Sequence, residues 1–221
     1  MSIVVLDDGT RELRLPLTRE EACSLAVGDP VALTGAVTMT IGLPTHRRMA
    51  ALLERGEALP QDLGGGAFVH LSSYNRERPG GGFEALYLNP STSTRYDDSM
   101  PAIIARSGVR VVGGKGGLGD AGVAALAAAG CVYVSFLGGG CTLLSRAIRS
   151  VVSVHWNEYI SQFRLVTLDV ERLGPAVVAI DAHGNSTYRN LREAARERLP
   201  GILDRLARAR GAAGTTTKET S

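Results

Sequence analysis

Two short polar loops carry the residues of this sequence that are best suited to bind a small anion. The first, Asn89 to Arg95, offers four consecutive hydroxyl groups and one guanidinium. The second, Gly113 to Gly119, offers bare backbone amides and the ammonium of Lys115. One expected helix and one expected strand separate the loops, so an α/β turn of chain can bring both to one edge of a sheet. Arg95 would then supply a planar fork, and Lys115 a point charge, for the same anion.

The glycine-rich loop does not match the stricter phosphate-binding motifs. A Walker A loop needs a glycine six residues before the lysine and Ser or Thr after it, and Val109 and Gly116 occupy those positions. A dinucleotide fingerprint in the proper register is also absent. Glycine amides and a helix N-terminus near Asp120 can still hold an anion. The alternative is a flexible strand–helix loop without a ligand.

Composition excludes several classes of function. The 221 residues are 44% hydrophobic, which is enough for one large domain, and the formal charge is only +2. Scattered basic residues and 5% aromatics do not fit a nucleic-acid binder. No apolar run is long enough for a membrane span, and the first residues lack the features of a signal peptide. We therefore expect a cytoplasmic protein with neither nucleic acid nor membrane as a partner.

The three cysteines form neither a disulfide framework nor a metal motif. Cys23, Cys131 and Cys141 are odd in number and widely spaced, and no Cys-x-x-Cys occurs. Cys131 opens an apolar strand and is expected to be a small core residue. No metal ligands are predicted, so any iron–sulfur cluster has to come from another chain.

The order of the expected elements predicts one α/β domain with a mixed sheet, over residues 1–190. Apolar or alternating runs between turn residues predict strands at 3–6, 11–17, 31–40, 67–72, 83–88, 109–112, 131–137, 151–156, 165–170 and 177–180. Helices are expected from the capping box Thr18–Glu21 to about Ala26 and at 44–55, 100–106, 121–129 and 142–149. Residues 73–82 are expected to form a polar loop.

The C-terminal part has a different composition. Residues 191–210 are rich in Arg, Glu, Leu and Ala and predict a helical segment, broken or kinked at Pro200. Residues 211–221 predict a disordered tail. Within the domain, Asp97 and Asp98 are expected to cap the helix that contains Pro101, and Asp120 to cap the next one.

Several short motifs, in this order and spacing, carry a family resemblance. They are Leu33-Thr34-Gly35, His46-Arg47-Arg48, Leu59 to Leu63, Pro90 to Asp97, Gly114-Lys115-Gly116, Gly138-Gly139-Gly140 and Asp181 to Asn185. The chain resembles, over roughly residues 10–190, the β subunit of iron–sulfur-dependent hydro-lyases, the class I fumarase and L-tartrate dehydratase family. The same module forms the C-terminal domain of single-chain class I fumarases.

The resemblance implies a swivelling β/β/α domain that closes over a [4Fe–4S] cluster held by an α subunit, in an α2β2 heterotetramer. The family's catalytic hydroxyl falls on Ser91, its substrate-binding arginine on Arg95 and its lysine on Lys115. His46 is expected to orient the site. Binding of a small carboxylic acid would also involve Thr92 and the loop glycines, Gly114 and Gly116.

Two departures from the family bear on the substrate. The family's Arg-Asp pair before the histidine is replaced by Gly42 and Leu43, and a run of small residues by Leu86 to Asn89. A substrate with one carboxylate fewer, or a bulkier end, is the resulting hypothesis, so the substrate need not be fumarate or tartrate. A non-catalytic paralogue is a further interpretation.

The chemistry of dehydration agrees with a division between two subunits. Hydroxide is a poor leaving group, and an open iron site can assist its departure as a Lewis acid. Negative charge also builds up next to the carboxylate, and cations stabilise that charge. This chain has the cations and lacks the iron ligands. Ser91 would transfer the proton with help from Lys115 or a partner carboxylate. A stand-alone anion-binding domain and a purely structural partner of a cluster protein are the alternatives.

Overall fold

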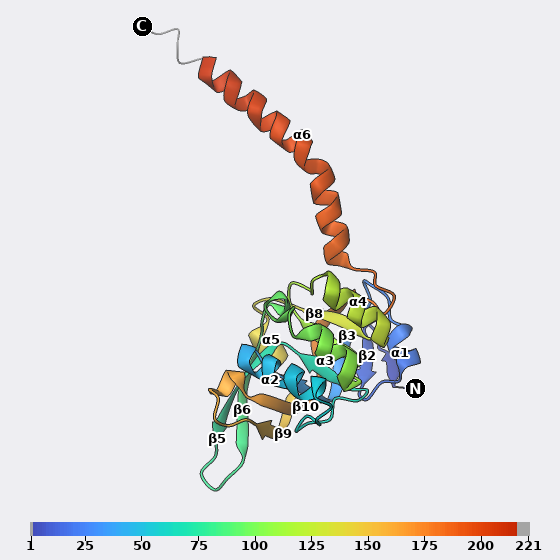
Figure 1. Cartoon of the computed structure of the whole chain (residues 1–221), viewed down its shortest axis with the longest axis vertical. Coiled ribbons are helices and arrows are strands. Elements are labelled where there is room, and N and C mark those ends of the chain that lie inside the picture. The colour runs from blue at the N-terminus through green and yellow to red at the C-terminus, as the bar shows by residue number, and fades with distance from the viewer. Residues whose placement is uncertain (1, 216–221) are drawn as a thin grey trace. The chain divides into compact units, whose positions relative to one another are not determined.

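The structure, a computed structural model, describes the backbone of residues 2–215 and the side chains of residues 2–210. The chain divides into two units, one up to Ser186 and one that begins at Thr187. Within the described residues the second unit is a single helix, α6 (Thr187–Thr215). The first unit is a mixed α/β domain, which confirms the expected fold class (Figure 1).

The first unit contains ten strands and five α-helices in its described part. The strands are β1 (Ile3–Val5), β2 (Arg11–Arg14), β3 (Pro30–Met39), β4 (Ala67–Val69), β5 (Leu71–Glu77), β6 (Phe83–Pro90), β7 (Val111–Gly114), β8 (Val132–Phe136), β9 (Ile148–His155) and β10 (Leu165–Ile180). The helices are α1 (Arg19–Cys23), α2 (Leu43–Glu54), α3 (Met100–Ser107), α4 (Asp120–Ala129) and α5 (Cys141–Ser145), with 3-10 turns η1 (Ser93–Tyr96) and η2 (Ser161–Phe163).

Eight of these strands form one mixed sheet in the order β1-β2-β3-β4-β7-β8-β10-β9. Within this sheet, neighbouring strands are parallel for β2, β3, β4, β7 and β8. The strands β1, β9 and β10 run antiparallel to their neighbours. Because β10 also pairs with β3, the strands β3, β4, β7, β8 and β10 form a closed ring. The remaining pair, β5 and β6, forms an antiparallel hairpin.

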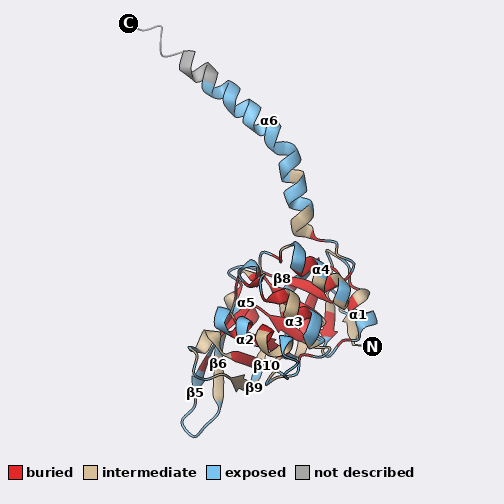
Figure 2. Ribbon diagram, viewed as in Figure 1, coloured by how far each residue is buried: buried red, intermediate tan, exposed pale blue. Residues whose placement is uncertain are grey.

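The core lies on the central strands, and three helices lie side by side over it. Buried side chains concentrate on β3, β4, β7, β8 and β10 (Figure 2). Helix α3 contacts both α2 and α4. Pro44 and Pro101 stand in the first turns of α2 and α3, where a missing N–H costs nothing. The predicted capping box of α1 is confirmed, since the Glu21 N–H donates to the Thr18 hydroxyl.

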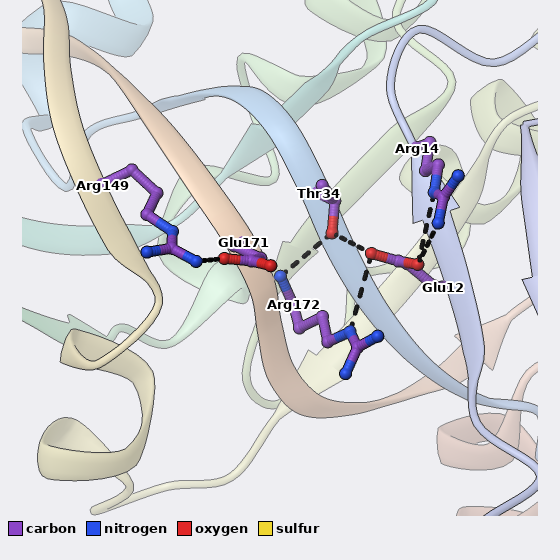
Figure 3. Close-up of polar contacts among 6 residues, drawn as sticks. All are labelled: Glu12, Arg14, Thr34, Arg149, Glu171 and Arg172. Carbon is purple, nitrogen blue, oxygen red and sulfur yellow. Dashed lines mark hydrogen bonds and ion pairs between the residues drawn. The ribbon is translucent and has the colours of Figure 1, made fainter. Parts of the chain in front are cut away.

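A polar network around the buried carboxylate of Glu12 joins β10 to β2 and β3 (Figure 3). Arg172, in a left-handed conformation at a β-bulge, donates its backbone N–H to the Thr34 hydroxyl at 3.0 Å. Thr34 in turn donates to a carboxylate oxygen of Glu12 at 2.7 Å, and Arg14 donates to the other oxygen at 3.0 Å. Glu12 is buried, and the hydrogen bond from Thr34 is the main cause that holds its pKa below the ordinary value.

Four expected elements differ clearly from the structure. The expected strand 67–72 is divided between β4, which ends at Val69, and β5, which begins at Leu71 and pairs with β6 instead. Residues 73–77, expected in a polar loop, belong to strand β5, because a projecting hairpin needs few apolar side chains. The expected strands 165–170 and 177–180 are parts of one strand, β10. The residues between them resemble a turn in sequence but form β-bulges within the strand. The helix expected at 142–149 ends at Ser145, and β9 already begins at Ile148.

The C-terminal helix is longer than expected. It begins at Thr187 rather than 191 and continues through Pro200, and Figure 1 shows it bending along its length. Residues 211–215 of the expected tail lie within α6, and residues 216–221 lie outside the described residues. None of the described helices combines the length and apolar character needed to cross a membrane.

Candidate active site

The predicted site residues gather where the parallel strands end. The chain leaves β3 toward Gly42, β4 toward His70, β7 toward Lys115 and β8 toward Gly138. The carboxyl ends of neighbouring parallel strands meet at one edge of a sheet, and in α/β barrels the loops at this edge carry the functional residues. The sheet therefore brings these four segments to a single edge.

The two polar loops are hydrogen-bonded to each other at this edge. The backbone N–H of Lys115 donates to the Ser91 carbonyl at 3.0 Å, and the Ser93 N–H donates to the Lys115 carbonyl at 2.9 Å. Thr92 and Lys115 form a parallel bridge. The sequence-based prediction that the loops meet is thus confirmed, and the backbone fixes Ser91 and Thr92 beside Lys115.

Glycine permits this close approach of the loops. A Cβ at Gly114 would overlap the Ser93 hydroxyl and would lie 3.1 Å from the Cβ of His70. Gly116 has a φ of +80°, and a Cβ there would lie 3.3 Å from the Thr92 methyl group. A larger residue at either position would force the loops apart, which gives both glycines a geometric role.

Two cations of the site are available for a ligand. Lys115 is half-buried and Arg95 is exposed. Among the described side chains, neither cation forms an ion pair. Thr92 is half-buried and Ser91 is 8% exposed. The backbone contacts bring Lys115 next to Ser91 and Thr92, whereas a contribution of the Arg95 guanidinium to the same carboxylate site stays a prediction.

A buried chain of hydrogen bonds supports the first loop from the protein interior. The sequence alone did not reveal this chain. His70 Nδ1 lies 2.8 Å from the Ser93 hydroxyl, which lies 2.7 Å from the Tyr133 hydroxyl. The Gly117 N–H donates to the Tyr133 oxygen at 3.3 Å. The signal for His70 was its position directly after the apolar segment 67–69, where a parallel strand ends.

The predicted histidine, His46, lies beneath the site and is fully buried. Its Nδ1 donates to the Gly42 carbonyl at 2.7 Å, and its ring stacks on Tyr96 with a centroid distance of 3.9 Å. The Tyr96 hydroxyl donates to the Ile41 carbonyl at 2.8 Å and lies 3.5 Å from the Ser91 hydroxyl. His46 thus contacts Tyr96, whose hydroxyl lies near Ser91, and its orienting role stays a prediction.

Both buried histidines are neutral at physiological pH. Burial lowers the pKa of His46 from 6.5 to about 4, and burial also holds the pKa of His70 well below its usual value. Their rings are 5.1 Å apart, and the Nε2 atom of each has no hydrogen-bond partner among the described residues. Neither histidine is placed to exchange protons with solvent.

The expected helix caps are wrong. Ser99 precedes α3, and Gly119 occupies the N-cap position of α4 with Asp120 as the first helical residue. The Asp97 carboxylate instead accepts the Gly119 N–H at 3.0 Å. Asp97 therefore ties the first loop to the start of α4, a long-range contact that local sequence could not show.

The described residues offer no ligand set for an iron–sulfur cluster. No group of three or more His, Cys, Asp or Glu side chains in this part of the chain could hold a metal. Cys131 is buried in the core, and burial raises the pKa of its thiol, so it stays protonated. The donor set of the described residues does not fit such a cluster.

The positions at which the sequence departs from the family pattern are closely packed against neighbouring residues. A Cβ at Gly42 would lie 2.7 Å from the Cβ of Phe163 and 2.6 Å from the Thr45 hydroxyl, so no side chain fits there without rearrangement. Leu88 is fully buried, and Tyr87 stacks on Tyr74 across the hairpin. The bulkier residues of this run thus stabilise the hairpin.

Comparison with known proteins agrees with this geometry. The family described as "Fumarase C-terminus" matches residues 6–191. The chain belongs to that family. It is 31% identical to the L(+)-tartrate dehydratase subunit beta of Escherichia coli K12, over 88% of this chain and 94% of that protein. It is 28% identical to a putative subunit of the same name from Methanocaldococcus jannaschii, over 85% and 95% of the two chains.

A longer member of the fumarase C-terminus family extends the comparison. The putative class I fumarate hydratase of Geobacillus stearothermophilus is 29% identical over 85% of this chain, but the match covers only 35% of that protein. The module therefore occurs both as a separate subunit and within a larger chain. The residues matched by the family include both polar loops and end early in α6.

Proposed function

We propose that this chain is the β subunit of a [4Fe–4S]-dependent hydro-lyase that adds water to an unsaturated carboxylic acid or removes it from a hydroxy acid. Membership of the fumarase C-terminus family supports a hydro-lyase subunit. The names of the relatives, subunit beta of tartrate dehydratase and class I fumarate hydratase, point the same way. The subunit name of the relatives also supports a heteromer.

One observation carries the proposal. The Ser91 loop and the Lys115 loop are joined by backbone hydrogen bonds, so that a residue with a hydroxyl group and a residue with a cation lie next to each other at the edge of the sheet. Preorganised cations stabilise charge that develops next to a carboxylate without any reorganisation during the reaction. Lys115 and Arg95 would bind the substrate carboxylate, together with Thr92 and the amides near Gly114 and Gly116.

Ser91 is the proposed proton-transfer group. A serine hydroxyl alone is a weak base and needs a neighbour that shifts its proton. The Tyr96 oxygen lies 3.5 Å away, and because Tyr96 donates its own proton to Ile41, its oxygen can accept from Ser91. Tyr96 would thereby orient the Ser91 hydroxyl by a hydrogen bond, while the proton that Ser91 gives up would pass to a carboxylate of the partner subunit. Lys115 would stabilise the resulting anionic form of Ser91. The buried, neutral His46 would keep Tyr96 in place.

The partner we propose is a cluster-bearing α subunit, in an α2β2 heterotetramer. The described residues of this chain do not fit a cluster, so the iron would be held by the partner. When bound there, the cluster would supply the Lewis acid for the departing hydroxide. Mass measurement of the anaerobically purified assembly, with iron and sulfide analysis, tests this composition.

The proposed substrate carries less negative charge than malate or tartrate. The close contact between Gly42, Phe163 and Thr45 leaves no room for the arginine that the family resemblance places there. We expect a hydroxy acid with one carboxylate fewer, and poor turnover of malate and tartrate. Efficient turnover of either acid by the assembly would contradict this part of the proposal.

The decisive experiment compares three loop variants in the assembled complex. Ser91→Ala is expected to lower kcat by about a hundredfold or more, with little change in KM. Lys115→Met is expected to raise KM as well, because it removes a carboxylate contact. Thr94→Ala, an exposed hydroxyl of the same loop, is the control and should retain activity.

Two other outcomes would replace the proposal. Full activity of the Ser91→Ala and Lys115→Met assemblies would make the chain a structural partner of a cluster protein. Tight binding of small organic acids by the isolated, iron-free chain, with no partner recovered, would indicate a stand-alone anion-binding domain.

A further inference from the structure

Helix α6 carries an exposed apolar stripe. Five large aliphatic side chains on it are between 40% and 63% exposed: Leu191, Leu199, Ile202, Leu203 and Leu206. At 100° per residue, these positions fall on one side of the helix, within an arc of about 120°. Figure 2 shows the helix exposed along most of its length. Such a contiguous stripe is typical of a surface that binds another molecule.

Arginines border this stripe. At 100° per residue, Arg196 flanks the stripe on one side, and Arg198 and Arg205 flank it on the other. Arg192 and Arg210 fall within the arc of the stripe, and Arg208 lies on the opposite side. All three acidic residues of the described helix lie on the opposite side: Glu193, Glu197 and Asp204. The stripe is therefore bordered by positive charge on both sides, and the negative charge lies away from it.

This arrangement argues against a second copy of α6 as the occupant. Residues beside the apolar seam of paired helices face each other, in parallel as well as antiparallel pairs. Two copies of α6 would bring arginine against arginine along both borders, and like charges at these positions destabilise the pair. A surface with acidic borders would instead form ion pairs with Arg196, Arg198 and Arg205.

The composition of the stripe also favours a protein over a lipid surface. Helices that lie in a membrane interface place Trp or Phe beside Leu on the apolar face. The described part of α6 contains neither Trp nor Phe. In addition, the curated relatives are named as subunits of an assembly, and most of the stripe lies beyond the family match, which ends at residue 191.

We propose that α6 docks through this stripe into an apolar groove with acidic borders on the partner subunit of the assembly. The inference rests on the proposed function, because it takes the partner from there. Docking would bury the five aliphatic side chains and pair the bordering arginines. Recruitment of the partner would then be separate from the residues that bind the substrate.

The test measures affinity between the partner and variants of the full chain. The probe is the partner that co-purifies anaerobically with the wild-type chain, identified by mass spectrometry and by its iron and sulfide. The variant L199S/I202S/L206S should weaken binding at least tenfold, and R196E/R198E/R205E should do the same. The matched control, E193Q/E197Q/D204N on the opposite side, should stay within about twofold of wild type.

The outcomes separate this inference from the proposed function. If no partner is recovered with the wild-type chain, the proposed function is contradicted. The docking inference then fails as well, because the protein proposed to bind the stripe does not exist. Recovery of the partner with equal affinity for wild type and both stripe variants would overturn the docking inference alone.

Three further measurements, made on the isolated chain, would assign the stripe elsewhere and overturn the inference. One is a dimer in light scattering that L199S/I202S/L206S abolishes. Another is co-sedimentation of the wild-type chain, but not of that variant, with vesicles of phosphatidylcholine and phosphatidylglycerol. The third is strong protection of the α6 amides from hydrogen exchange, which would mean that the chain covers its own stripe.

Discussion

Ser91 and Ser93 lie two positions apart in one loop, but their hydroxyl groups have different surroundings. The Ser93 hydroxyl is fully buried between His70 and Tyr133, with oxygen and nitrogen partners at 2.7 and 2.8 Å. Among the side chains that the structure describes, the Tyr96 oxygen at 3.5 Å is the one hydrogen-bond partner of the Ser91 hydroxyl. One serine is thus part of the internal framework, and the other is the one that we propose to react.

The two serines should respond differently to the same change. Ser93→Ala leaves the His70 nitrogen and the Tyr133 hydroxyl without their shared partner, so we expect a loss of about 1–3 kcal/mol in unfolding free energy. Ser91→Ala should alter the unfolding free energy by no more than about 0.5 kcal/mol while removing activity. Urea denaturation of the isolated chain measures the first effect. Equal stability of the two variants would contradict this division.

The buried histidines make the stability of the chain depend on pH. Because burial depresses the pKa of His46 and His70 in the folded state, the unfolded chain binds more protons below pH 6.5. Stability is therefore complete above pH 6.5 and falls as the pH is lowered toward 4. For His46 alone, a pKa near 4 corresponds to a loss on the order of 3 kcal/mol across this window.

Denaturation at pH 7 and pH 5 measures this effect. The variant His46→Gln should show a smaller decrease in unfolding free energy between the two values than the wild type. A substitution of the exposed His183 by Asn serves as the control and should leave the decrease unchanged. An identical decrease in the His46→Gln variant would show that His46 does not titrate as its burial implies.

Polar contacts hold the bulge of β10. Its bulge at Arg172 is held by Thr34, which also fixes the buried carboxylate of Glu12. Close by, Arg149 and Glu171 form an ion pair between exposed side chains of β9 and β10 (Figure 3). The two sets of contacts lie in the same region but differ in burial, so they should differ in energetic weight.

Substitution at Thr34 tests this difference. Thr34→Val removes a donor to a buried carboxylate, and we expect it to lower the unfolding free energy by about 1–3 kcal/mol. Glu12 has a lowered pKa when folded, so its contribution is present above pH 4.5 and is lost as the pH falls below that value. Thr34→Val should therefore flatten this acid dependence in denaturation curves.

Arg149→Gln is the control for the Thr34 variant. Surface ion pairs contribute little, so this substitution should change the unfolding free energy by less than about 1 kcal/mol. A larger effect for Arg149→Gln than for Thr34→Val would mean that the exposed pair, and not the buried network, holds the bulge.

Elements with local signals were predictable, and contacts between distant segments were not. The spacing of Arg95 and Lys115 indicated that their loops meet, since α/β connections return to the same edge of a sheet. The continuity of β10 was hidden because Glu171, Arg172 and Gly174-Pro175 resemble a turn in sequence, and only pairing with β3 keeps them in a strand. The contact of Asp97 with Gly119 was hidden for the same reason.

Roles of buried polar residues were the hardest to predict. His70 and Tyr133 stand in or next to apolar strands and have no motif of their own. Their hydrogen bonds to Ser93 exist only because β4, β7 and β8 pair in parallel register. The sequence predicted the two polar loops and did not indicate the buried residues that support the first of them.

At the scale of the whole molecule, stability and association are expected to belong to different units. The sheet and the core cluster lie within residues 1–186, and α6 contributes no residue to that cluster. A chain that ends at Glu193 should therefore melt within about 2–4 °C of the full chain, with a smaller helical signal in circular dichroism. A decrease of more than 10 °C on truncation, about the effect of losing several kcal/mol, would show that α6 supports the core.

The ring of strands also sets an order for the synthesis of this protein. The ring closes only when β10 pairs with both β3 and β8, and β10 ends at Ile180, near the end of the first unit. A nascent chain that already contains both site loops still has an open sheet with unpaired edges on β3 and β8. Until residue 180 leaves the ribosome, those edges are exposed to other chains, so the last strand to be translated is the one that protects the rest.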